Sequence, residues 1–99
     1  MNFGLPESDY QNLIKVFLRH PKIEKVLLFG SRAKGTFRPG SDIDLVFYAN
    51  ALDFKEFLHV QIELDELELP QKIDLINGNQ IRNPDLIAHI KRVGKVVVG

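Results

Sequence analysis

Residues 30–45 read GSRAKGTFRPGSDIDL, and this stretch decides how the rest of the chain is organised. Its first part holds three glycines and a proline, so the chain turns here, with room for one helical turn after Ser31. The branched and aromatic run DIDLVFYA at 42–49 predicts a strand. Because strand side chains alternate between faces, Asp42 and Asp44 project from the same face, about 7 Å apart at Cα. Two carboxylates are therefore expected beside a turn.

The segment before this stretch predicts a helix followed by a strand. The apolar run KVLLF at 25–29 meets Gly30, as a buried strand does when it ends in a tight turn. Ser8 and Gln11 have the spacing of a capping box, and a helix is expected from there until just before Pro21. Its apolar residues recur with the spacing of one helical face and are Tyr10, Leu13, Ile14, Phe17 and Leu18.

The segment after it predicts a second helix. Asp53 and Glu56 form another capping-box pattern, and Leu52 and Phe57 have the spacing of a hydrophobic staple. Helical periodicity then continues towards Leu67. An alternation with the period of a strand is also present at Val60, Ile62 and Leu64.

The last third of the chain predicts a strand, a helix and a short edge strand. KIDLIN at 72–77 is the expected strand and ends in an Asn-Gly turn. Asn83 as N-cap and Pro84 at the first helical position mark a helix that ends before Gly94. Residues 96–98 are all valine and add the edge strand.

This alternation of helices and strands predicts an α/β (α+β) fold with a small mixed sheet of three to four strands flanked by helices. A chain of 99 residues with 44% hydrophobic content can close one core. We therefore expect residues 1–99 to form a single domain.

Composition excludes several classes of function. Lys+Arg and Asp+Glu both number 13, which argues against a membrane partner and against direct binding of nucleic acid. The absence of cysteine excludes thiol nucleophiles and disulfide frameworks. No signal peptide or apolar span is recognisable, so a cytoplasmic location is expected. The histidines at 20, 59 and 89 are scattered and are predicted to be structural or solvated.

A third carboxylate belongs with the first two. Asp74 lies between Ile73 and Leu75 in the strand at 72–77, so it projects from the face opposite to these apolar neighbours. If this strand lies next to the one carrying Asp42 and Asp44, three carboxylates meet. Like charges at this distance need a cation between them, and magnesium takes carboxylate and phosphate oxygens as ligands.

The turn offers the anion-binding half of such a site. Gly30 lets the backbone approach a phosphate, and the hydroxyl and amide of Ser31 can bind it. Arg32, Lys34 and Arg38 lie in the same loop and are expected to neutralise a triphosphate locally.

Each of these residues alone also has an ordinary structural explanation. Ser41 and Asp42 can bond nearby turn backbone, Asp74 can face water on an edge strand, and the loop cations can simply be solvated. It is their combination that favours a nucleotide site.

The pattern resembles the polymerase-beta-like nucleotidyltransferase superfamily. Gly30-Ser31, ten intervening residues, Asp42-x-Asp44 and a later Asp74 make up its motif, and the string at 30–45 resembles the minimal nucleotidyltransferase branch in particular. Members of this branch often act as antitoxins beside HEPN-domain toxins. The resemblance covers roughly residues 23–77 and implies the nucleotidyltransferase fold.

The resemblance also implies a reaction and its residues. Asp42 and Asp44 would hold two magnesium ions, Asp74 would complete the metal site, and Gly30 and Ser31 would bind the triphosphate. The expected activity is transfer of AMP from ATP to a hydroxyl group, with a tyrosine of a HEPN toxin as the acceptor. Larger superfamily members use a further domain to hold the base and acceptor. We therefore expect a partner protein, or a second copy of this chain, to complete an open site.

Two other functions remain open at this stage. The chain can be a binding module that neutralises its partner by occlusion, without catalysis. It can also be a transferase for a small molecule, which normally needs additional sequence to form a pocket.

Overall fold

The computed structural model describes residues 2–99 and contains a four-stranded mixed sheet with the strand order β3-β2-β1-β4. β1 is antiparallel to β2 and to β4, and β2 is parallel to β3. This confirms the predicted fold class. The elements, in chain order, are α1 (Glu7–Leu18), β1 (Ile23–Phe29), α2 (Gly30–Lys34), β2 (Ile43–Ala49), α3 (Phe54–Asp65), β3 (Ile73–Asn77), the 3-10 turn η1 (Gly78–Gln80), α4 (Pro84–Val93) and β4 (Lys95–Val98).

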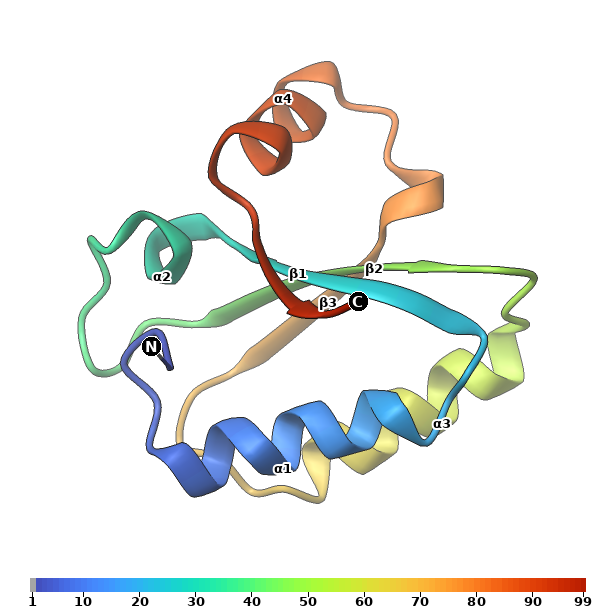
Figure 1. Cartoon of the computed structure of the whole chain (residues 1–99), viewed down its shortest axis with the longest axis horizontal. Coiled ribbons are helices and arrows are strands. Elements are labelled where there is room, and N and C mark those ends of the chain that lie inside the picture. The colour runs from blue at the N-terminus through green and yellow to red at the C-terminus, as the bar shows by residue number, and fades with distance from the viewer. Residues whose placement is uncertain (1) are drawn as a thin grey trace.

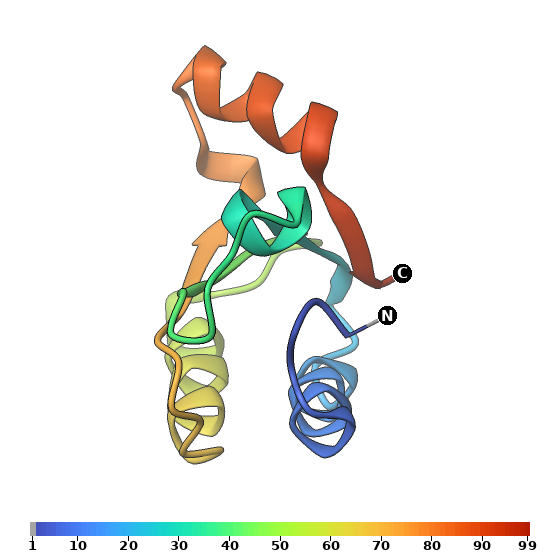
Figure 2. The same cartoon turned by 90° about the vertical axis from the view of Figure 1, so that its left-hand side faces the viewer.

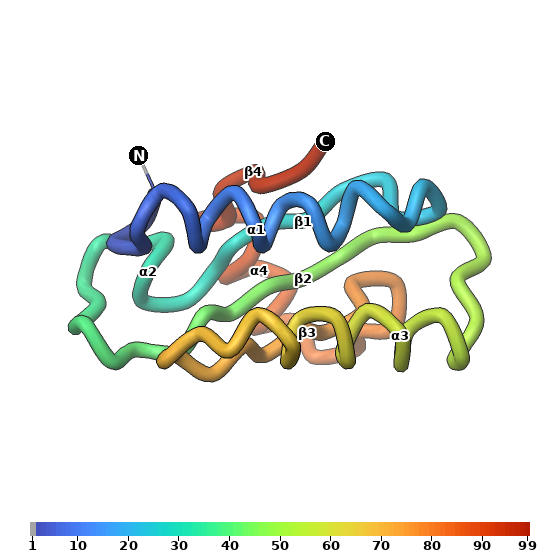
Figure 3. Tube along the Cα trace, turned by 90° about the horizontal axis from the view of Figure 1, so that it is seen from below, coloured from blue at the N-terminus to red at the C-terminus, as the bar shows by residue number. Residues whose placement is uncertain are grey.

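Helices cover both faces of the sheet (Figures 1 and 2). α1 and α3 lie side by side beneath one face, here called the lower face, as the view from below also shows (Figure 3). α4 covers the other, upper face, and α2 follows the end of β1 at the same side. The alternation of strand residues therefore assigns each side chain either to the α1/α3 side or to the α4 side.

The larger core lies under the lower face. Ile43, Leu45 and Phe47 of β2 are at most 1% exposed and pack among buried residues of α1 and α3. These helix residues are Leu13, Val16, Phe17, Val60 and Leu64. Burial of this apolar surface is the main term that stabilises the fold.

A smaller apolar cluster lies between the upper face of the sheet and α4. Phe29, Val46 and Ile90 form its buried centre, with Tyr48 and Leu86 among the partly buried residues around it. It covers only part of this face, because the next β2 residue on the same side towards the start of the strand is Asp44. The upper face therefore changes from apolar to acidic along β2.

The start of α1 differs from the prediction. The helix begins at Glu7, its N-cap is Pro6, and no side chain caps it, so the predicted capping box at Ser8 is wrong. Glu7 instead accepts hydrogen bonds from the side chains of Asn2 and Gln11. Pro6 has no backbone N–H and a fixed φ, and it therefore starts the helix two residues earlier than expected.

The start of α3 confirms the N-cap but not the reciprocal half of the capping box. The side chain of Asp53 accepts a hydrogen bond from the Glu56 amide at 2.7 Å. The Glu56 carboxylate turns instead to the buried ring of His20, where its Oε2 lies 3.2 Å from Nδ1. Glu63 lies 2.9 Å from the other ring nitrogen of His20, so this histidine joins the turn after α1 to α3. The helical interpretation of the segment at 53–67 is confirmed.

The last elements are close to those predicted. Asn83 caps α4 by accepting hydrogen bonds from the amides of Asp85 and Leu86, and Pro84 is the first residue of the helix. β4 pairs with β1 at the edge of the sheet. Among residues 2–99, no helix is both long and apolar enough to cross a membrane.

Candidate nucleotide and metal site

The acidic residues gather at the starts of β2 and β3. Asp44 and Asp74 are register partners in the parallel pair, so their Cα atoms lie on adjacent strands about 5 Å apart. Asp42 lies immediately before β2 and is exposed. β2 and β3 are therefore neighbours, as the sequence analysis required if Asp74 is to lie near Asp42 and Asp44.

The pKa of Asp44 reflects its partial burial and the nearby acidic residues. Partial burial raises the pKa of Asp44 above its ordinary value of 3.8, and the negative charges of Asp74 and Asp42 raise it further. His89, when protonated, and Lys72 act in the opposite direction. Like-charge repulsion of this kind favours binding of a cation.

Gly30 lies directly against Asp44. Its φ is +72°, a left-handed conformation that glycine adopts without strain, and a Cβ at this position would clash with Asp44 Oδ2. Asp44 is also close to the end of β1, because it pairs with Phe29 in the antiparallel register. The absence of a side chain at Gly30 therefore lets the turn after β1 and the carboxylate of β2 share one corner.

Asp42, Asp44 and Asp74 are carboxylates, the kind of ligand that magnesium takes. Within residues 2–99, no three acidic or histidine side chains converge closely enough to hold an ion by themselves. Magnesium in nucleotide enzymes is usually held by one or two carboxylates together with substrate phosphates, rather than by an all-protein cage. The raised pKa of Asp44 and the neighbouring Asp74 and Asp42 match that arrangement.

Arg32 lies inside the protein rather than on the surface of the loop. Arg32 is only 2% exposed, and its Nη1 donates a hydrogen bond to the Phe3 carbonyl at 2.8 Å. Nε and Nη2 donate to the Ser41 carbonyl at 3.2 and 3.0 Å, and Nη2 also reaches the Pro39 carbonyl at 3.2 Å. The guanidinium lies over the Phe37 ring, 4.9 Å from its centroid.

These contacts join α2, the N-terminal segment and the loop that leads to Asp42. Burial lowers the pKa of Arg32, and the guanidinium is satisfied by backbone carbonyls. The sequence grouped Arg32 with Lys34 and Arg38 as cations for a triphosphate. The structure separates it from them, because Lys34 and Arg38 are both exposed.

Ser31 and Ser41 have different surroundings. Ser31 lies partly buried in the first turn of α2, directly after Gly30. Ser41 is a turn residue, as its ordinary interpretation held: its Oγ accepts from the Arg38 amide at 2.8 Å and its own amide donates to the Arg38 carbonyl at 2.9 Å. The turn at 38–41 thus delivers Asp42 to the start of β2.

The sequence analysis did not predict that His89 lies at this site. This residue of α4 is partly buried, and its Nε2 accepts a hydrogen bond from the Gly30 amide at 3.2 Å. Its ring also packs edge-on against Phe29, with centroids 6.1 Å apart and planes at 82°. Gly30 and His89 are 59 residues apart, and no local pattern indicates that they meet.

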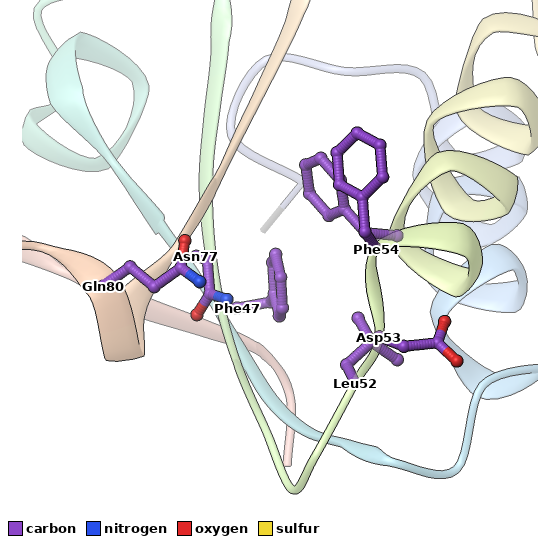
Figure 4. A pocket seen from close by; sticks show the side chains of 7 residues that line it. Phe47, Leu52, Asp53, Phe54, Asn77 and Gln80 are labelled. Carbon is purple, nitrogen blue, oxygen red and sulfur yellow. The ribbon is translucent and has the colours of Figure 1, made fainter.

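The main cavities of the described chain are lined by other residues than the three acids. One of about 190 Å³ lies between β2, β3 and the start of α3 (Figure 4). It is lined by Phe47, Leu52, Asp53, Phe54, Phe57, Asn77 and Gln80. Phe47 and Asn77 are register partners three residues beyond Asp44 and Asp74, which corresponds to roughly 10 Å along the strands.

Comparison with known proteins gives a family and several structural neighbours. The family model described as "Polymerase beta, Nucleotidyltransferase" matches residues 11–99. No curated protein matches the chain.

Three solved structures illustrate the structural similarity. A chain of a toxin–antitoxin crystal structure with AMP-PNP is 27% identical with a TM-score of 0.72, over 91% of this chain and 73% of the other. A mutant of the toxin–antitoxin MntA–HpeT gives 25% identity and a TM-score of 0.71 over the same shares. A complex of a tri-AMPylated Shewanella oneidensis HEPN toxin with an MNT antitoxin gives 23% and 0.65, over 94% and 71%, and at that identity supports the fold alone.

Proposed function

We propose that this chain, which belongs to the polymerase beta nucleotidyltransferase family, transfers AMP from ATP to a hydroxyl group on a partner protein. The observation that carries the proposal is the corner where Asp44 lies between Asp74 in the next strand and the Gly30 turn. It combines acidic side chains with the Gly30–Ser31 turn, where a backbone without a side chain can approach a phosphate. The structural neighbour with AMP-PNP supports a nucleotide as the ligand.

The acidic residues would hold the metal. Asp42, Asp44 and Asp74 would bind two magnesium ions together with phosphate oxygens. When bound, these ions supply charge neutralisation at the attacking and leaving oxygens. Asp74 is also our candidate for accepting the proton of the acceptor hydroxyl, because it is exposed at the rim of the corner.

The turn and the loop would hold the triphosphate. Ser31 would donate hydrogen bonds to phosphate oxygens from its hydroxyl and amide, and it directly follows Gly30, which lies against the Asp44 carboxylate. Lys34 and Arg38 are exposed and would screen phosphate charge from the solvent side. Arg32 would act indirectly, by holding the loop carbonyls that precede Asp42.

The acceptor we propose is a tyrosine of a HEPN-type toxin. The acids do not line the main cavities of the described chain, so a small acceptor would find few contacts there, whereas a protein surface would add a wall to the site. The toxin–antitoxin neighbours that are 27% and 25% identical to this chain support a partner protein as the acceptor. Adenylate on a tyrosine adds negative charge and bulk, which would prevent a nuclease from binding RNA phosphates.

Intact-mass spectrometry of a co-expressed HEPN partner tests the proposal. We expect adenylate on the partner with the wild-type chain, and none with Asp42→Asn or Asp44→Asn. Asp65→Asn is the matched control, because Asp65 is an exposed carboxylate on α3, and it should modify the partner as the wild type does.

A binding module that acts by occlusion is the second candidate. α3 exposes Phe54, Leu58 and Ile62, which recur four residues apart and form one apolar stripe that a partner can cover. If the partner is inhibited but unmodified, and the Asp42→Asn and Asp44→Asn chains inhibit it equally well, occlusion replaces transfer.

A further inference from the structure

His89 connects α4 to the turn on which the proposed phosphate site is built. Its Nε2 accepts the Gly30 N–H at 3.2 Å, and its ring packs edge-on against Phe29, the last residue of β1. The histidine therefore contacts two consecutive residues where β1 passes into α2. Both contacts come from a helix that is more than fifty residues away along the chain.

The Gly30 amide needs an acceptor that the local backbone does not supply. The first amides of a helix have no partner within that helix, and α2 begins at Gly30. His89 supplies this acceptor from the opposite side of the corner. The Gly30 amide is thus used within the protein, and we expect the next residue, Ser31, to meet the phosphate.

The position of this turn also affects Asp44. Gly30 has a φ of +72° and lies in direct contact with the Asp44 carboxylate. A change in the turn would displace both the Ser31 hydroxyl and the space that Asp44 occupies. Small displacements of this kind reduce transfer strongly, because the reacting groups must be held in position.

We propose that His89 is a positioning residue for nucleotide transfer. By accepting the Gly30 N–H, it holds Ser31 and Asp44 in the relative positions that bind the triphosphate and its metal. The inference rests on the proposed function but concerns a residue outside the family motif. An Nε2 that accepts a hydrogen bond carries no hydrogen of its own.

Two substitutions separate the hydrogen bond from the packing. His89→Phe keeps an aromatic ring against Phe29 but has no acceptor. His89→Gln places an amide oxygen near the position of Nε2 and has no ring. His59→Phe is the matched control, because His59 is an exposed histidine on α3.

Three measurements on the full chain test the proposal. Hydrogen exchange of the Gly30 amide by NMR reports the hydrogen bond directly. Titration with a non-hydrolysable ATP analogue reports the triphosphate site, and kcat and KM for transfer report its use. We expect His89→Phe to exchange the Gly30 amide at least about tenfold faster and to lose roughly tenfold to a hundredfold in kcat/KM, with a nearly unchanged melting temperature. His89→Gln should recover most of both losses, and His59→Phe should match the wild type.

Other results would overturn the proposal. Wild-type kcat/KM and analogue affinity in His89→Phe would show that the hydrogen bond positions nothing. Losses confined to His89→Gln and accompanied by a lower melting temperature, with His89→Phe behaving as the wild type, would assign His89 to packing alone. Absence of transfer by the wild-type chain would instead refute the proposed function. In that case the Gly30 exchange and the analogue affinity still decide whether His89 organises the turn.

Discussion

Successive residues of β2 serve opposite sides of the sheet. Ile43 and Leu45 point to the lower face, are fully buried and pack against α1 and α3. Asp44 lies between them in sequence, faces the upper side beside α2, and has a raised pKa. The lower face is an apolar core of tightly packed side chains, whereas the upper corner concentrates like charges. Because the two are back to back on one strand, single substitutions can separate stability from chemistry.

Removing the Asp44 charge should produce the largest effect. Asp44→Asn should reduce nucleotidyl transfer about 10³-fold or more, because a metal contributes several kcal/mol to the transition state and each 1.36 kcal/mol is a factor of ten. The melting temperature should equal or exceed that of the wild type, since the substitution relieves repulsion with Asp74 and Asp42. Transfer assays and thermal melts of the same preparations check both halves. Retention of transfer would contradict the assignment of Asp44.

Truncation of Leu45, the next residue in β2, should reduce stability and leave transfer nearly unchanged. Leu45→Ala leaves a cavity in the lower core and should cost about 2 to 5 kcal/mol in the free energy of unfolding, measured by urea denaturation. The kcat/KM of the molecules that remain folded should stay within a few-fold of wild type. A loss of transfer without a loss of stability would show that the two faces are not separable.

Substitution of Arg32 tests whether the loop before Asp42 contributes to the stability of the fold or to nucleotide binding. Arg32→Lys keeps the charge but cannot reproduce the hydrogen bonds to Phe3, Pro39 and Ser41, and should cost on the order of 2 kcal/mol of stability. Arg38→Lys is the exposed control and should leave the melting temperature unchanged. If Arg32→Lys instead melts normally but uses ATP poorly, Arg32 contacts the nucleotide.

The pH dependence of stability should show the smallest effect. An acid with a raised pKa in the folded state binds its proton more tightly there than in the unfolded chain, so folding loses stability as pH rises from about 3.8 through the raised value. Urea denaturation across this pH range, with a chelator present, should show that the free energy of unfolding of the wild type falls as the pH rises. Asp44→Asn should remove it. An identical pH profile for the two proteins would mean that the acidic corner does not strain the fold.

Several features of this protein are local, and the sequence alone predicts them. The alternation in DIDLVFYA assigns Asp44 and Leu45 to opposite faces, because the pleat has a period of two. Asp53 and Asn83 cap their helices through bonds that span only two or three residues. The part of the family motif at 30–44 is likewise a short stretch, to which only Asp74 is added from a later strand. The prediction at Ser8 was wrong even at this scale, because Pro6 started the helix first.

Tertiary structure alone decided which of these local features meet. The parallel register of β2 and β3 puts Asp74 beside Asp44, and a one-residue slip would have turned Asp74 to the other face. Arg32 has the same local sequence signal whether it is solvated or buried. It is buried because its guanidinium donates to the carbonyls of Ser41, in the same loop, and of Phe3, in the N-terminal segment. His89 reaches Gly30 because α4 packs over the upper face. Such contacts depend on long-range burial and pairing, which periodicity and spacing along the chain do not encode.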